Sequence, residues 1–261
     1  RLNEEIAALG AVNLAALSEL ETARERKSFL DAQAFFREAV ESVFAQTFAD
    51  WELLLVDDGS SDKSSSMALQ YAGQHSERIR YFEHDGHANR GLPASRNLGL
   101  RQARGKYVAL LDSDDVWLST KLEEQVGLLD MHPEVVLLYG SSQYWYSWTG
   151  KQEDIALDFV QGPDVPADKV YDPPILLRLF LSDSVSTPCP SDILFRRDPI
   201  LRLGGFEESF GPPLTMHEDQ AFLAKVVLHG SVFVAKNCWD RYRIHANSCC
   251  AVTRREGRES A

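Results

Sequence analysis

The sequence lacks the features that would tie it to a membrane core or to nucleic acid. No uninterrupted apolar run approaches the ~18 residues that a membrane-spanning helix needs, and the chain does not open with a secretory signal pattern. Its net charge of −12 argues against a nucleic-acid-binding surface. We therefore expect a cytoplasmic protein with no nucleic-acid partner, and we leave peripheral association with a membrane open.

Cysteine is also scarce, and its spacing is uninformative. The four cysteines are Cys189, Cys238, Cys249 and Cys250; they form no CxxC pair and have no histidines at matching positions, which argues against a zinc site. Reduced thiols are the default expectation for such a chain. The composition of the whole chain is that of an ordinary globular protein: of 261 residues, 44% are hydrophobic and 25% are charged. This length and apolar content suffice for one large or two small cores.

The most informative stretch is GKYVALLDSDDVW, which begins at Gly105. Residues 107–111 form an apolar run of strand length and are followed by an acidic run, 112–115. On an extended backbone, side chains two apart point to one side, so Asp112 and Asp114 could converge on a divalent cation. The alternative is an acidic turn that caps a helix over 117–129. The stretch alone favours neither interpretation.

The surrounding pattern alternates strands with helices and predicts an α/β fold with a mostly parallel sheet and helices on both of its faces. A second acidic turn, 57–62, follows the apolar strand 51–56. Ligands of such sheets bind beyond the carboxyl ends of the strands, where both acidic turns would lie. The other expected elements are helices over 1–28, 34–48, 64–75, 93–105 and 220–228, strands over 79–83, 135–139, 191–197 and 231–235, and a disordered tail over 251–261.

Five pieces in order then resemble the inverting family 2 glycosyltransferases of the GT-A fold. They are EAVESVFAQTFADWELLLVDDGSSD, NRGLPASRNLGLRQARGKYVALLDSDDVW, LFRRDPILRLGGFEE, HEDQAF and YRIHANS. The resemblance covers about Phe29 to Cys250. It implies a nucleotide-binding half over 29–140, an acceptor half over 141–250, and transfer of a sugar from a nucleotide-diphosphate donor to an unidentified glycan, lipid-linked or protein acceptor, as in polysaccharide biosynthesis.

The resemblance also implies residue roles. Asp58 corresponds to the carboxylate that reads the nucleotide base, and Asp57 beside it to a further donor-binding residue. Asp112 with Asp114 corresponds to the DXD pair that holds Mg²⁺ or Mn²⁺, Asp114 being the direct ligand. Asp219, with Glu218 beside it, corresponds to the catalytic base. Arg96 and His245 fall near the diphosphate or the metal.

Each implied role has a structural alternative. Asp219 could cap the helix from residue 220, the 57–58 pair could form an Asx turn, and His245 could be purely structural. The aromatic residues between 144 and 148 could stack on a sugar or pack in the core.

The N-terminus departs from the family pattern. Family members begin with a strand of the VSVIIPxYN type before the position of Phe29, and this chain has a helical segment there instead. Residues 1–33 resemble part of the structural-maintenance-of-chromosomes ATPases but contain none of their ATP-binding motifs, so no ATPase function follows. We expect 1–28 to be a helical appendage. The alternative function is a catalytically impaired or non-catalytic protein that retains the fold, and a third interpretation is a helical interaction module with 1–28 as its working part.

Overall fold

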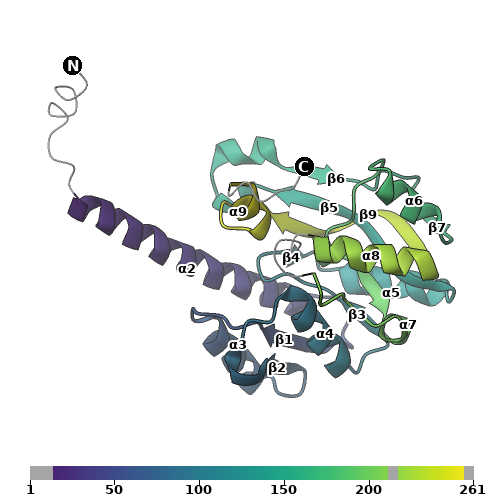
Figure 1. Cartoon of the computed structure of the whole chain (residues 1–261), viewed down its shortest axis with the longest axis horizontal. Coiled ribbons are helices and arrows are strands. Elements are labelled where there is room, and N and C mark those ends of the chain that lie inside the picture. Colours follow the sequence, from purple (N-terminus) through teal and green to yellow (C-terminus); the bar gives the residue numbers. More distant parts are fainter. Residues whose placement is uncertain (1–13, 211–216, 256–261) are drawn as a thin grey trace.

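A long helix dominates the N-terminal part of the computed structural model, which describes residues 14–210 and 217–255. Helix α2, Leu14–Phe44, is 31 residues long, and Figure 1 shows its first half projecting from the body of the molecule. Its second half packs against the body through Phe35, Ala39, Val40 and Val43, which are all buried and recur at helical spacing. The expected division at residue 28 therefore falls inside one continuous helix; residues 1–13 lie outside the described part.

A small sheet follows. Strands β1 (Leu53–Asp57) and β2 (Ile79–Glu83) pair in parallel, with Leu53 opposite Ile79, and among the described residues each has only the other as a strand partner. Helices α3 (Ser64–Gln74) and α4 (Leu92–Gln102) complete this unit, with a 3-10 turn, η1, over Asp85–His87. The second edge of β1 is therefore unpaired, as the missing family strand predicts.

The large sheet has seven strands in the order β3-β8-β5-β9-β4, with β6 added to β5 and β7 to β9. Its strands are β3 (Tyr107–Ala109), β4 (Val116–Trp117), β5 (Val135–Trp145), β6 (Phe159–Gln161), β7 (Lys169–Tyr171), β8 (Leu194–Arg196) and β9 (Ser231–Arg243). Only β5 and β9 pair in parallel here; every other pair is antiparallel. The α/β class is confirmed, but the sheet is mixed rather than mostly parallel because the strands of the second half return in the opposite direction.

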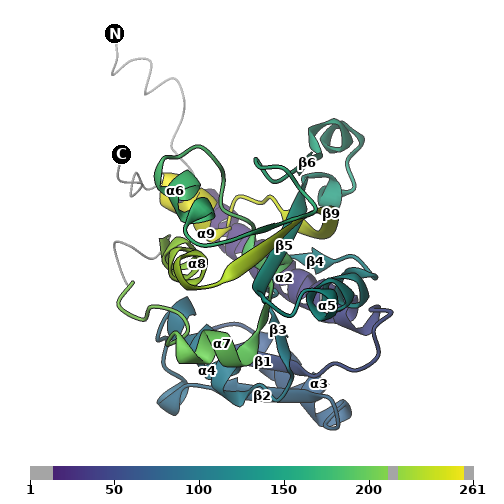
Figure 2. The same cartoon turned by 90° about the vertical axis from the view of Figure 1, so that its right-hand side faces the viewer.

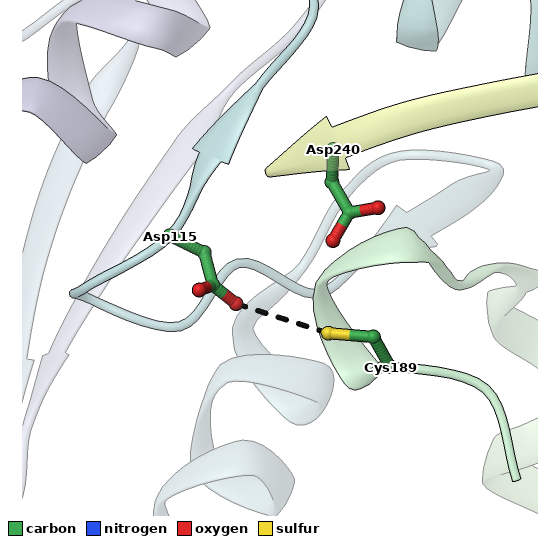
Figure 3. Close-up of side chains that lie close together, drawn as sticks. All are labelled: Asp115, Cys189 and Asp240. Atoms are coloured by element: carbon green, nitrogen blue, oxygen red, sulfur yellow. Dashed lines mark hydrogen bonds between the residues drawn. The ribbon is translucent and has the colours of Figure 1, made fainter. Parts of the chain in front are cut away.

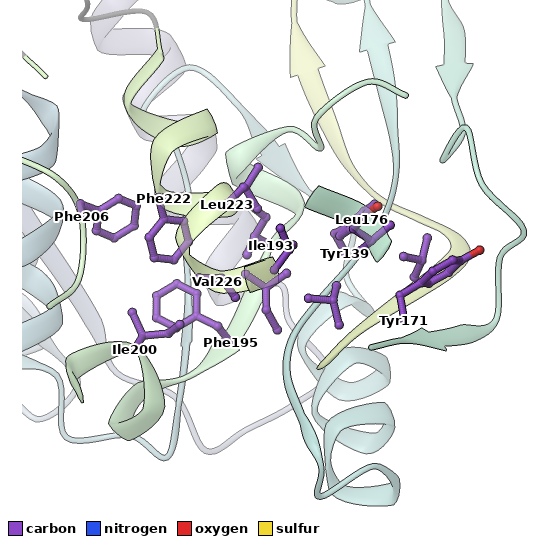
Figure 4. Packing of buried hydrophobic residues seen from close by; sticks show 14 of the residues in the cluster. Tyr139, Tyr171, Leu176, Ile193, Phe195, Ile200, Phe206, Phe222, Leu223 and Val226 are labelled. Atoms are coloured by element: carbon purple, nitrogen blue, oxygen red, sulfur yellow. The ribbon is translucent and has the colours of Figure 1, made fainter. Parts of the chain in front are cut away.

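Helices cover both faces of this sheet, as Figure 2 shows for α5 and α8. Leu137 and Tyr139 of β5 pack with α8, while Leu138 packs with α5 on the other face. Figure 4 shows the larger cluster, in which the Phe206 and Phe222 rings stack at 4.1 Å between centroids. The remaining elements are α5 (Lys121–Met131), η2 (Ser147–Thr149), η3 (Gln152–Leu157), α6 (Ile175–Leu181), η4 (Pro190–Asp192), α7 (Arg197–Arg202), α8 (Glu218–His229) and α9 (Cys249–Arg255).

Several expected boundaries are wrong. Strands β5 and β9 continue to residues 145 and 243 rather than ending at 139 and 235, and the strand expected over 191–197 covers only 194–196. Residues 116–117 pair with β9 as a short strand, so the helix expected over 117–129 begins only at Lys121. The tail expected to be disordered contains helix α9 as far as Arg255, and residues 256–261 lie outside the described part. None of the described helices combines the length and apolar character that crossing a bilayer requires.

Candidate functional site

A pocket of about 460 Å³ opens between the second half of α2, strand β1 and the segment that follows β3. One wall is apolar and includes Phe35, Val40 and the length of β1. Polar side chains from segments distant in the sequence line the rest: Asp57, Asp58, Ser60, Ser64, Tyr81, Ser113, Asp114, His245 and Asn247. Both acidic turns thus reach one pocket, as their shared position at strand ends predicts.

Asp58 joins the first acidic turn to the start of α4. Its carboxylate accepts the backbone N–H of Arg90 at 2.7 Å and that of Gly91 at 3.0 Å. The turn passes so close to this loop that a side chain on Gly59, whose φ is 78°, would lie 2.8 Å from the backbone nitrogen of Asn89. Asp58 therefore satisfies orphan donors at a helix N-terminus while it lines the pocket.

The Asp57 carboxylate is hydrogen-bonded to neighbouring protein groups. Its carboxylate accepts hydrogen bonds from the Ser60 N–H at 2.8 Å, the Ser65 hydroxyl at 2.5 Å and the Tyr81 hydroxyl at 3.0 Å. Burial acts to raise the pKa of Asp57, but these hydrogen bonds, that from Ser65 foremost, outweigh it and lower the pKa below its ordinary value. The alternative of a structural turn therefore describes Asp57 well.

The acidic run after β3 is a turn and not an extended strand, since the Asp115 N–H donates to the Asp112 carbonyl at 3.1 Å. The two-residue alternation invoked for Asp112 and Asp114 is therefore wrong. Asp112 Oδ1 lies 2.9 Å from Arg96, whereas Asp114 lines the pocket with Oδ2 2.9 Å from His245 Nε2. The two carboxylates expected on one cation thus have different partners, Arg96 for Asp112 and His245 for Asp114.

His245 and Arg243 anchor the Asp114 end of the site. The His245 ring packs against Phe35 at 5.1 Å between centroids. The Arg243 guanidinium lies 4.2 Å from the centre of the Phe35 ring and donates through Nε to the Asp114 carbonyl at 2.7 Å. Its other end pairs with Glu38 of α2 at 2.5 Å. The second half of α2 thus supports the loop that carries Asp114.

Arg96 connects the acidic run to the start of α8. Its side chain is 7% exposed and pairs with both Asp112 and Glu218. The second oxygen of Glu218, Oε2, is buried with no hydrogen-bond partner among the described residues. Asp112 and Glu218, which lie more than 100 positions apart in the sequence, therefore form ion pairs with the same buried guanidinium.

The acids at the start of α8 have raised pKa values. Burial raises the pKa of Glu218 to about 7 even though Arg96 acts against it, and burial also raises the pKa of Asp219. Asp219 lies inside the first turn of the helix and accepts the Gln220 N–H at 2.7 Å. It is therefore not the residue that caps this helix. Among the described residues, none forms a salt bridge with its carboxylate.

Sequence reasoning missed Phe35, Glu38 and Arg243. Arg243 stands inside the quoted YRIH motif, so a search for buried arginines beside motif histidines could have found it. No sequence pattern marks Phe35 or Glu38 as part of the site, because they read as ordinary positions of an amphipathic helix. Of the aromatic stretch, Tyr144 stacks on Phe159 and so supports the packing alternative.

The fold resembles that of GT-A glycosyltransferases. The S. aureus TarS 1–349 structure in complex with UDP-GlcNAc aligns with a TM-score of 0.58 at 20% identity, covering 84% of this chain and 57% of that one. The mannosyltransferase PcManGT from Pyrobaculum calidifontis, in complex with GDP-Man and Mn²⁺, aligns with a TM-score of 0.56 at 18% identity, covering 85% and 57%. At these identities the likeness establishes the fold alone.

The sequence itself establishes the family. Residues 28–204 match the Glycosyl transferase family 2 model, and the chain belongs to that family. It is 40% identical over 95 residues to the putative glycosyltransferase EpsE of Bacillus subtilis, covering 36% of this chain and 34% of EpsE. It is 35% identical over 103 residues to the glucosyltransferase WfgD of Escherichia coli, covering 40% and 38%. The chain thus spans well under half of these relatives.

Proposed function

We propose that this chain transfers a sugar from a nucleotide-diphosphate donor to an acceptor hydroxyl, in a metal-dependent reaction that inverts the anomeric configuration. Membership of family 2 supports glycosyl transfer, and the TarS and PcManGT structures carry UDP-GlcNAc and GDP-Man. The observation that carries the proposal is the meeting of Asp58 and Asp114, from the two acidic turns, in one pocket at the strand ends.

The donor is expected to occupy this pocket with its base near Asp58 and Tyr81 and its diphosphate near Asp114. A net charge of −12 on the chain opposes the binding of a diphosphate, so the site needs a local source of positive charge. Arg96 already forms ion pairs with two carboxylates, so its positive charge is compensated within the protein.

The residues at the Asp114 end fit a divalent cation. The Asp114 carboxylate and the His245 imidazole face each other at 2.9 Å, and carboxylate oxygen with few other protein ligands suits Mg²⁺ or Mn²⁺ beside substrate phosphates. Asp114 and His245 would hold the ion, with Asp112 kept nearby by Arg96. A bound ion supplies Lewis-acid stabilisation of the departing diphosphate.

Asp219 is the proposed general base. The acceptor oxygen attacks the anomeric carbon while the bond from that carbon to the diphosphate breaks, and the hydroxyl proton passes to the Asp219 carboxylate. The nucleoside diphosphate leaves with the bonding electron pair, so one displacement inverts the configuration. The raised pKa of Asp219 suits this role, because a base works best when its pKa approaches the operating pH. Glu218, paired with Arg96, would position the helix end rather than take the proton.

A second candidate function is a protein that keeps the fold without binding donor. The observation in its favour concerns the second edge of β1, which has no strand partner within residues 14–210 and 217–255. This edge borders the pocket, since Leu53 to Val56 line it. Such an edge leaves part of the proposed donor site without the strand support that a continuous sheet would give.

Isothermal calorimetry with UDP and with GDP, each with and without Mn²⁺, separates the two candidates. A donor-binding enzyme should bind one of these nucleotides only when Mn²⁺ is present, and Asp114→Ala should abolish that binding. The matched control is Asp130→Ala, which removes a carboxylate paired with Lys106 outside the pocket. Absence of binding in the wild-type chain across both nucleotides would favour the non-catalytic candidate, and normal binding by Asp114→Ala would remove Asp114 from the site.

A further inference from the structure

A second group of metal-binding side chains lies buried behind the acidic turn. Asp115, Cys189 and Asp240 come from three distant segments, and their ligand atoms all lie within 4.8 Å of one another. Figure 3 shows the three side chains pointing toward a common centre, with the Cys189 sulfur 3.9 Å from Asp115 Oδ2. Asp115 and Asp240 are fully buried. In the part of the chain that the structure describes, this is the one group of its kind.

Asp240 gives the independent indication that something is bound here. Both of its oxygens are buried, and neither has a hydrogen-bond partner among the described residues. The Ser142 hydroxyl and the Cys189 thiol are near enough to act on its pKa, but neither has the geometry of a hydrogen bond to it. An unpaired buried carboxylate costs several kcal/mol, so native structures give such groups a partner.

The protein's own cations do not provide that partner. Lys121 is the buried cation whose charge lowers the pKa of Asp240. Its ammonium, however, donates its hydrogen bonds to Gln125 Oε1 and the Asp192 carbonyl, each at 2.7 Å. The Asp192 carboxylate adds a third buried acid, held by the Gly140 N–H. Asp192 and Asp240 thus both face one ammonium whose hydrogen bonds go elsewhere, and Asp240 is left without a cation hydrogen-bonded to it among the described residues.

We propose that Asp115, Cys189 and Asp240 bind a structural Zn²⁺ ion. A thiolate beside carboxylates favours zinc over Mg²⁺ or Mn²⁺, which prefer oxygen ligands alone. The two unpartnered oxygens of Asp240 can fill two positions, so that three residues complete a four-coordinate site. The thiol proton, and any proton on the carboxyl groups, passes to solvent when the ion binds. Two of the three residues, Asp115 and Asp240, are fully buried, and such burial is typical of structural rather than catalytic sites.

This site is separate from the proposed donor metal. Asp115 turns inward, where its carboxylate accepts the Ser191 hydroxyl at 2.5 Å and the Arg243 N–H at 2.9 Å, while Asp114 lines the pocket. These outer hydrogen bonds would orient Asp115 as a ligand. A zinc ion here would join the acidic turn to β9 and to the segment before β8, and so fix the loop that carries Asp114.

Metal analysis of the full chain tests the proposal. The chain is purified without chelators, freed of loosely held metal on a chelating resin, and analysed by mass spectrometry for metals. We expect about one zinc per chain, and replacement by Co²⁺ should give the near-ultraviolet absorption of a thiolate–cobalt bond. Cys189→Ser should lose that absorption and bind zinc about 100-fold more weakly or worse, since even outer residues of metal sites contribute 10–100-fold.

Three further variants make the result specific. Cys238→Ser removes a half-buried thiol two positions from Asp240 and should retain the zinc. Asp114→Ala should also retain it, even if nucleotide binding is lost. EDTA should lower the melting temperature of the wild-type chain by removing the zinc, and Asp240→Asn should abolish this effect. The proposal would be overturned by a wild-type chain that contains no zinc and whose melting temperature responds to neither Zn²⁺ nor EDTA. Full zinc content in Cys189→Ser would also overturn it. Asp240 would then be a buried protonated acid.

Discussion

The raised pKa of Glu218 predicts a specific pH dependence of stability. Glu218 is 4% exposed, one of its oxygens has no partner, and burial raises its pKa from an ordinary value of 4.5 to about 7. We propose to replace it by Gln, which has nearly the same shape but never carries the charge. The difference in unfolding free energy between the two chains, followed against pH, isolates the titration of this one group.

The sign follows from proton binding. Between about pH 4.5 and 7 the folded chain holds a proton on Glu218 that the unfolded chain has lost, so the stability of the wild-type chain falls as the pH rises. A shift from 4.5 to about 7 corresponds to about 3 kcal/mol, reached above pH 7 and absent below pH 4.5. Glu218→Gln lacks this loss, so its stability relative to wild type should increase by about 3 kcal/mol across that window.

Urea unfolding at pH 5, 6, 7 and 8 measures this difference. Arg96→Met gives a second check, because Arg96 acts to lower the pKa of Glu218 and its removal should extend the loss of stability to higher pH and so enlarge it. Arg101→Met, on the same helix with a side chain 56% exposed, is the matched control and should leave the pH range of the loss unchanged. A pH-independent difference between wild type and Glu218→Gln would refute the reasoning and mean that Glu218 is well solvated.

Three other outcomes are expected. Asp219→Asn should leave donor binding intact and lower turnover by about 10²–10⁴-fold in a transfer assay, and unchanged turnover would remove it as the base. Phe222→Ala should cost about 3–5 kcal/mol in urea unfolding because its ring is buried against Phe206, whereas Leu228→Ala on the same helix, 47% exposed, should cost under about 0.5 kcal/mol. Replacing residues 1–28 by a VSVIIP-type strand should raise the melting temperature and strengthen nucleotide binding by pairing the free edge of β1; no change in either would mean that the edge needs no partner.

Local pattern alone determined most of the elements. The apolar strand before Asp57, the amphipathic face of Phe35 to Val43 and the glycine-bounded helix before Tyr107 all follow from periodicity and turn chemistry, which act over a few residues. The ordered motifs also identified the family, which the match over residues 28–204 confirms. The position of both acidic turns at strand ends was enough to predict that they share a site.

Strand direction and side-chain partnership were decided only by the tertiary structure. Antiparallel pairing of β8 with β3 and β5 depends on how the second half of the chain returns, which no local pattern encodes. The sequence likewise could not reveal that Arg96 bridges Asp112 and Glu218, or that Glu38 of α2 reaches Arg243. Cysteine spacing argued against a zinc site, yet folding brings Cys189 to Asp115 and Asp240 from segments 74 and 51 positions away. Such contacts are set by packing between distant segments, and a linear sequence carries no direct record of them.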